Sequence, residues 1–116
     1  MKSYLLILVL ALFIVTQQSF YPSHNNHVNG NFNKLLGSNN FLSGSHNKLF
    51  GNFNGVVGHG NGVVGNFNGV IGNGNGVFGN ANGVFGNGNA VFGSGNGIFG
   101  NGNHVQGYGN AIGWHY

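Results

Sequence analysis

From residue 24 onward, polar and apolar positions follow a pattern that returns every seven residues. In each heptad the third position is Asn, the fifth is Val, Leu or Ile, and the seventh is Gly, which gives the repeat x-x-N-x-V-x-G. Thirteen heptads run from His24 to Trp114 without an insertion, and only Trp114 departs from the seventh-position Gly. Repetition at a fixed period indicates a fold built from one small unit stacked many times.

A period of seven is also that of the α-helical coiled coil, but the residue types exclude a helix. A coiled coil needs two apolar seams and good helix formers, whereas each interior Gly costs a helix about 1 kcal/mol. Positions three, five and seven alternate instead with positions four and six, which is the period of two of a strand with one buried face. Each heptad therefore predicts a strand of about five residues, followed by a turn at a Gly with positive φ.

Two heptads are expected to form one coil of 14 residues, so the predicted fold class is all-β, a two-sided β-solenoid (β-roll). Coils would stack at about 4.8 Å, with the Val, Leu and Ile side chains as a thin core. Stacked Asn amides would bond from coil to coil and so satisfy polar groups that a narrow core otherwise leaves unpaired. The central part of this structural ladder is Asn54, Asn61, Asn68, Asn75, Asn82, Asn89 and Asn96.

Two alternatives to this fold remain open from the sequence. A three-sided coil of 21 residues is the rival solenoid, although like residues 14 apart, Lys34 with Lys48 and Phe53 with Phe67, favour two sides. A disordered or amyloid-like chain is the other alternative, because Gly and Asn with few charges also describe low-complexity sequence. Disorder imposes no register, so the strict phase of the heptads favours a folded β-solenoid.

The N-terminal segment has a different composition. It contains Lys2, an unbroken apolar run from Leu5 to Val15, and a polar stretch that ends at Ser19. The run is shorter than the roughly 20 apolar residues of a membrane span, so it predicts a secretory signal peptide, with an uncleaved anchor as the alternative. We therefore expect residues 1–19 to be a signal peptide, residues 20–114 to hold the β-roll, and residues 115–116 to form the C-terminal end of a secreted, extracellular protein.

The composition excludes several function classes. Without Asp, Glu or Cys the chain has neither the carboxylates of acid–base catalysis nor a thiol nucleophile, so no enzyme is expected. His24 and His27 are spaced to share a metal, but two neutral ligands make a weak site, and we expect neither metal nor cofactor. After the signal the only Lys residues are Lys34 and Lys48, too few to bind nucleic acid. No membrane contact is expected once the signal is removed.

The outward positions four and six form the surface of the expected roll. Because alternate heptads lie on opposite sides, the sixth positions form two apolar ladders, each a candidate face for ice binding or self-association. Gly mostly occupies the fourth positions, so the rings either stand on a bare sheet or fold over the Gly positions and shield it. Where the second position is Phe53 or Phe67, the sixth position is Val or Ile, so most heptads carry one large ring, which indicates space-filling. One ladder consists of Phe50, Val64, Phe78 and Phe92, and the other of Val57, Ile71, Phe85 and Phe99.

The ends of the array differ from its middle, since polar side chains occupy many of the outward positions there. Terminal repeats of a solenoid have to protect open strand edges from pairing with other chains. Trp114 and Tyr116 are expected to cover the C-terminal end of the core. Their removal is therefore expected to promote end-to-end assembly.

The repeat x-x-N-x-V-x-G, from His24 to Trp114, resembles that of the perennial ryegrass-type antifreeze and ice-recrystallisation-inhibition proteins of grasses. The resemblance implies a left-handed β-roll that binds ice through outward residues of one flat face. Those residues are mostly Thr, Ser and Val in the family, whereas here the fourth positions are mostly Gly and the sixth are Phe, Val or Ile. The alternative function is a self-assembling structural, surface-coat or adhesive Gly-rich protein. The expected partners are thus an ice surface or further copies of the chain, as a homo-oligomer or filament.

Overall fold

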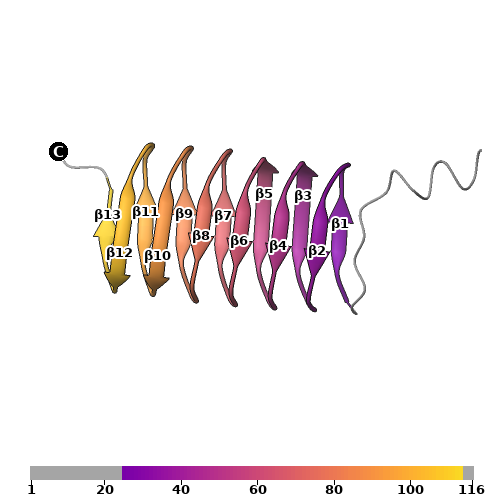
Figure 1. Ribbon diagram of the computed structural model, residues 1–116, viewed down its shortest axis with the longest axis horizontal. Helices are drawn as coiled ribbons and strands as arrows, with labels where there is room; N and C mark the ends of the chain where they lie inside the picture. The colour runs from indigo at the N-terminus through magenta and orange to yellow at the C-terminus, as the bar shows by residue number, and fades with distance from the viewer. Residues whose placement is uncertain (1–24, 114–116) are drawn as a thin grey trace, which may run out of the picture.

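The computed structural model describes residues 25–113, and these form a solenoid of short strands without a helix (Figure 1). The expected signal peptide, His24, Trp114 and Tyr116 lie outside the described residues. No helix able to cross a membrane occurs within residues 25–113. One strand arises from each heptad. The strands are β1 (His27–Asn29), β2 (Lys34–Leu36), β3 (Phe41–Ser45), β4 (Lys48–Phe50), β5 (Gly55–His59), β6 (Gly62–Val64), β7 (Gly69–Ile71), β8 (Gly76–Phe78), β9 (Gly83–Phe85), β10 (Ala90–Ser94), β11 (Gly97–Phe99), β12 (His104–Tyr108) and β13 (Ala111–Ile112).

The strands form two parallel sheets, one on each side of the rod (Figure 1). The odd sheet has seven strands in the order β1-β3-β5-β7-β9-β11-β13, and the even sheet has six in the order β12-β10-β8-β6-β4-β2. Neighbouring strands pair residues 14 apart, such as Val63 with Val77 and Val77 with Val91. The two-sided coil of 14 residues is therefore confirmed, and the three-sided coil is wrong.

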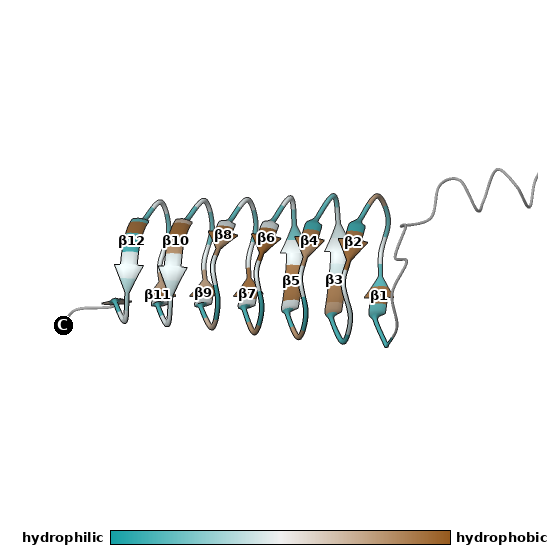
Figure 2. Cartoon of the chain, turned by 60° about the horizontal axis from the view of Figure 1, so that its bottom comes forward, coloured by the Kyte–Doolittle hydropathy of each residue, from teal (hydrophilic) through white to brown (hydrophobic). Residues whose placement is uncertain are grey.

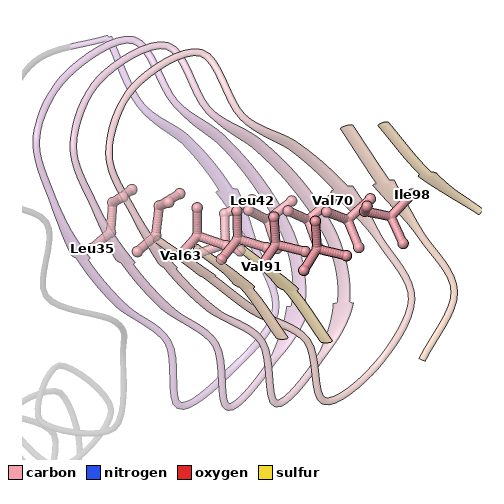
Figure 3. Packing of buried hydrophobic residues seen from close by; sticks show 11 residues of the cluster. Leu35, Leu42, Val63, Val70, Val91 and Ile98 are labelled. Carbon is pink, nitrogen blue, oxygen red and sulfur yellow. The ribbon is translucent and has the colours of Figure 1, made fainter. Parts of the chain in front are cut away.

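The fifth positions supply a single file of apolar side chains between the two sheets (Figure 3). Val28 and Ile112, at the two ends of the file, are only partly buried and pack against it. Burying one Val, Leu or Ile side chain contributes about 1.5–3 kcal/mol, and the file repeats that gain at every heptad. The predicted thin core is confirmed. Its buried members are Leu35, Leu42, Leu49, Val56, Val63, Val70, Val77, Val84, Val91, Ile98 and Val105.

The third-position Asn side chains form the predicted ladder on the inside of the coils. The side-chain amide of Asn75 donates to Oδ1 of Asn61 at 3.1 Å and to the carbonyl oxygen of Gly86 at 2.8 Å. Its own Oδ1 accepts from the backbone N–H and the side-chain amide of Asn89, at 3.0 and 3.1 Å. Among the described residues no buried side-chain nitrogen or oxygen lacks a partner. The bond to the Gly carbonyl was not predicted, and it ties the ladder to the corner that follows β9.

The strands are shorter than predicted, because most of them cover only positions four to six. The backbone N–H of Asn75 bonds to the side-chain Oδ1 of Asn61 at 3.0 Å, so a side chain takes the place of a neighbouring strand at the third position. Backbone pairing begins one residue later, where the N–H of Gly76 donates to the carbonyl oxygen of Asn89 at 2.8 Å.

The seventh-position Gly residues turn the corners of the coil and need to be Gly for two separate reasons. Gly79 has a φ of 140°, a backbone conformation that is essentially restricted to Gly. A Cβ added at Gly79 would also overlap the carbonyl oxygen of Gly93 in the next coil. Stacking at strand distance therefore leaves no room for a side chain at this corner.

The second positions adopt a left-handed conformation that the sequence did not predict. Phe53, Phe67 and Ala81 have φ of 57–60°, which costs a residue with a Cβ about 1–2 kcal/mol relative to Gly. The rings of Phe53 and Phe67 stack on each other at 5.0 Å and are 52% and 63% exposed at the corner. The prediction of one space-filling ring per heptad stays a prediction.

A second ladder, also not predicted, follows the first positions along the outside of the corners. The N–H of Asn52 donates to Oδ1 of Asn66 at 2.9 Å, and the N–H of Ser45 donates to Nδ1 of His59 at 3.1 Å. Here the later coil accepts from the earlier one, whereas in the inner ladder the earlier coil accepts. Asn, Ser and His all supply an acceptor, which explains why these residue types occupy the first position.

Candidate interaction faces

The structure brings the predicted ladder of the even sheet together on one flat side of the rod. Phe50 pairs with Val64, Val64 with Phe78, and Phe78 with Phe92 across β4, β6, β8 and β10. Val64, Phe78 and Phe92 are exposed by 41–45%, while Phe50 is half-buried. These four side chains therefore form one continuous apolar ridge, which we call the even ridge.

The ladder of the odd sheet is assembled in the same way on the opposite side. Val57 pairs with Ile71, Ile71 with Phe85, and Phe85 with Phe99 across β5, β7, β9 and β11. All four are exposed, from 40% at Phe85 to 50% at Phe99. We call this row the odd ridge. Both predicted rows are thus present on the molecule, and what they bind is a separate question.

The distance between neighbouring rings along each ridge follows the distance between the strands that carry them. Phe78 and Phe92 stack with their centroids 5.1 Å apart, and Phe85 and Phe99 stack at 4.9 Å, each pair within 3° of parallel. These distances are close to the separation of about 4.8 Å between neighbouring strands. Contact with the next ring restricts the rotamer of each one, so the ridges are ordered surfaces with the period of the coil.

A strip of Gly residues lies beside each ridge at the fourth positions. A Cβ added at Gly55, Gly69 or Gly97 would meet no atom within 4 Å, and these residues do not have positive φ. The fold therefore has no need of Gly here, in contrast with the corners. Gly in a strand lowers stability and often marks a place where another surface approaches closely. We call the row Gly55, Gly69, Gly83 and Gly97 the odd groove.

The sequence left open whether the Phe rings fold over the fourth-position glycines and shield the sheet, and the structure shows this only in part. A ring carbon of Phe78 lies 3.8 Å from the Cβ position of Gly76, and one of Phe85 lies 4.0 Å from that of Gly83. The two rings thus lean over the neighbouring glycines. They nevertheless remain 45% and 40% exposed. Each ridge is available to a partner.

The two faces differ in charge. On the even sheet the fourth positions include Lys34 and Lys48 at one end and His104 at the other, and Nζ of Lys34 lies 5.8 Å from the centre of the Phe50 ring. The described outward residues of the odd sheet include neither Lys nor Arg. Hydrophilic segments otherwise gather at the turns between strands (Figure 2). This asymmetry follows from sheet membership and was not predicted.

One further exposed ring on the odd sheet was missed. Phe41 occupies a fourth position in β3, is 46% exposed, and stacks on His27 at 5.1 Å. Its register partner in the next coil is Gly55. The signal was present in the sequence, since Phe41 precedes Gly55 by one coil, but an assignment of the fourth positions to Gly obscured it.

The described His residues contact neighbours along the rod and do not cluster. Among residues 25–113 no three His, Cys, Asp or Glu side chains lie close enough to hold a metal ion. The ring of His46 stacks on Phe32 at 5.1 Å, and Nε2 of His104 lies 3.2 Å from Nε2 of Gln106. These contacts stabilise the ends and corners of the solenoid.

Comparison with protein-family models and with curated proteins gives no match for this chain. The likeness to grass antifreeze proteins accordingly stays a resemblance in the repeat. The β-solenoid fold does not by itself indicate a function. Function has to be argued from the two faces.

Proposed function

We propose that this protein is a secreted, non-enzymatic ice-binding protein that acts through the even ridge. The observation that carries the proposal is the even ridge itself, a row of outward side chains repeated once per coil at the strand spacing. A flat, regular and only weakly polar surface is suited to a crystalline partner that presents its own regular lattice.

Rigidity supports this function. The backbone beneath the ridge is held from coil to coil by the inner Asn ladder and by the first-position ladder at the corners. A surface that is already ordered loses little conformational entropy when it binds. Removal of the apolar ridge from liquid water then contributes directly to adsorption.

Charge selects the even face over the odd face for ice. The ammonium groups of Lys34 and Lys48 remain hydrated when the face lies on ice, because liquid water persists around the edge of the contact. In a dry protein interface the same groups would lose water, and no Asp or Glu exists in the chain to compensate them. The central stretch around Val64, Phe78 and Phe92 is free of charge and forms the expected contact.

An ice-recrystallisation assay tests the proposal. The chain without residues 1–19 should inhibit recrystallisation at micromolar concentration, and Val64→Lys or Phe78→Lys should remove that inhibition. Ile71→Lys is the matched control, since Ile71 occupies the same repeat position on the odd sheet and is similarly exposed. Lack of inhibition by the unsubstituted protein, or equal loss in Ile71→Lys, would contradict the proposal. Circular dichroism establishes that each variant is folded.

The second candidate, a self-assembling structural or coat protein, is favoured by the presence of exposed ridges on both sides of the rod. A filament that uses both faces would bury Lys34 and Lys48 without acidic partners. Concentration-dependent filaments in electron micrographs, together with no ice inhibition, would favour this function over ice binding.

A further inference from the structure

We propose that two copies of this chain pair face to face through their odd sheets, with each odd ridge lying in the odd groove of the other copy. The pairing is a two-fold arrangement whose axis runs along the rods, so that the rods are parallel and the facing strands antiparallel. It goes beyond ice binding and does not depend on it, because it uses the opposite face.

The shape of the odd sheet is complementary to itself under this two-fold axis. Ridge and groove occupy positions six and four of the same strands, so they run parallel at a separation of about 6.6 Å. An axis midway between them, above the buried fifth positions, places Ile71 over the partner copy's Gly69 and Phe99 over the partner copy's Gly97. Both glycines have open space where a Cβ would be. Self-complementarity of one patch is the condition for a two-fold interface.

The identity of the occupant follows from the same geometry. A partner that fills the odd groove and covers the odd ridge has to present a ridge and a groove with the period of the coil. A second copy of the chain supplies both at the required spacing along β5, β7, β9 and β11. Within these four strands each sixth-position side chain then meets a fourth-position Gly of the other copy.

Charge excludes the even sheet from the same pairing. Two even sheets in contact would bring Lys34 and Lys48 into the interface, and the sequence contains no acidic residue to neutralise them. An unpaired buried charge costs more than the burial of apolar surface returns. The odd sheet carries no such penalty, so the dimer is specific to one face.

The size of the face fits a reversible dimer. The odd sheet has seven strands, of which β3 and β5 have five residues and the others two or three. Six steps of about 4.8 Å and at most five residues of about 3.3 Å give a face no larger than roughly 30 by 17 Å. Two such faces would bury at most about 1,000 Å² in total, which is the lower limit for a specific interface. Dissociation is therefore expected in the micromolar range.

Sedimentation equilibrium of the secreted protein at about 1 to 100 µM measures this dimer directly. The unsubstituted protein should change from monomer to dimer over that range. Ile71→Lys should weaken the dimer by a factor of about ten or more, and Val64→Lys, at the same repeat position of the even sheet, should leave it unchanged. A monomer at every concentration, or equal behaviour of the two variants, would overturn the proposal.

Two variants with a larger side chain at a fourth position distinguish the proposed fit from unspecific apolar association. Gly69→Val and Gly62→Val both add an apolar side chain at a position with open space, so both should fold. Gly69→Val should weaken the dimer by about tenfold because it fills the odd groove, while Gly62→Val should not. If Gly69→Val strengthened association, the contact would be unspecific and the proposal would fail.

Thiol cross-linking tests the orientation, and the natural chain has no Cys to interfere. Copies with Gly69→Cys mixed with copies carrying Ile71→Cys should be joined by a short bifunctional maleimide. Preferential joining of Ile71→Cys to Phe85→Cys would indicate antiparallel rods and overturn the orientation. Ile71→Lys should lose the dimer while retaining ice inhibition, so that failure of one proposal is distinguishable from failure of the other.

Discussion

Glycine has two different roles in this protein, one at the corners of the coil and one on its flat faces. At the corner, Gly79 has a φ of 140°, and a Cβ there would overlap the backbone of the next coil. On the face, Gly69 lies in an ordinary strand conformation, and a Cβ there would meet nothing. The corner Gly is thus required by the fold, whereas the face Gly leaves space above the sheet for a partner. Within one heptad, positions three, five and seven specify the fold, and positions four and six form the surface.

The largest expected difference is between two Gly→Ala substitutions. Gly79→Ala should lower the free energy of unfolding by about 4 kcal/mol or more, because it combines a backbone clash with an unfavourable φ. Gly76→Ala, three residues away on the even face, should raise stability by about 0.5–1 kcal/mol, because Ala loses less backbone entropy on folding than Gly. Urea unfolding followed by circular dichroism measures both. Similar losses in the two variants would mean that the face glycines are also required by the fold.

The second largest difference in stability is expected between variants of the inner Asn ladder and variants of the first-position ladder. Asn75→Ala removes two donated and two accepted hydrogen bonds inside the coil, and should cost about 3 kcal/mol because buried donors and acceptors are left unpaired. Asn73→Ala removes the exposed acceptor of the His59 N–H, which water replaces, and should cost less than about 1 kcal/mol. Urea denaturation midpoints, compared at an equal dependence of the unfolding free energy on urea concentration, test which variant loses more stability. A greater loss in Asn73→Ala would contradict it.

Adjacent apolar residues should also behave differently. Val77 is fully buried, and Val77→Ala should lower the free energy of unfolding by about 2 kcal/mol through lost burial and a cavity. Phe78 is 45% exposed, and Phe78→Ala should cost about 0.5 kcal/mol while reducing ice inhibition. Unfolding curves and the recrystallisation assay separate the two effects. A large stability loss in Phe78→Ala would show that the ridge belongs to the core.

The smallest expected effects are those of two Ala→Gly substitutions, which should change stability in opposite directions. Ala81 has a φ of 57°, so Ala81→Gly should raise stability by about 1 kcal/mol through relief of the left-handed conformation. Ala90 begins β10 without positive φ, so Ala90→Gly should lower stability by about 0.5–1 kcal/mol. Thermal unfolding of the pair measures both shifts. Shifts of the same sign would argue against the left-handed second position.

The sequence predicted the parts of the repeat in which one residue type does one task. The pattern predicted burial of Asn at the third position and of Val, Leu or Ile at the fifth, because inward and outward positions alternate there with period two. The first-position ladder was not predictable in this way, since Asn52, Ser45 and His59 share only a hydrogen-bonding role. The left-handed second position had a signal, namely Gly at Gly60, Gly74 and Gly88, which Phe and Ala in other heptads obscured.

The candidate faces were predicted as two rows of residues on opposite sides of the roll, but not as surfaces that differ in charge. Lys34 and Lys48 are visible in the sequence, yet their consequence depends on both lying on the even sheet. The groove at Gly69 likewise required the structure, because the sequence places Gly69 on the outward side but does not show that the space at its Cβ position is open. The signal peptide and the cap at Trp114 and Tyr116 remain predictions.

Thermal unfolding of a fourfold variant tests the separation of fold and surface most directly. Gly62, Gly69, Gly76 and Gly83 would all be replaced by Thr, a residue that favours strands and has ordinary contacts or open space at each site. We predict a folded solenoid whose unfolding midpoint rises by several degrees, since each exchange relieves about 0.5–1 kcal/mol of unfavourable Gly entropy. An unfolded chain, or a midpoint well below that of the natural protein, would contradict the claim that the face glycines serve the surface alone.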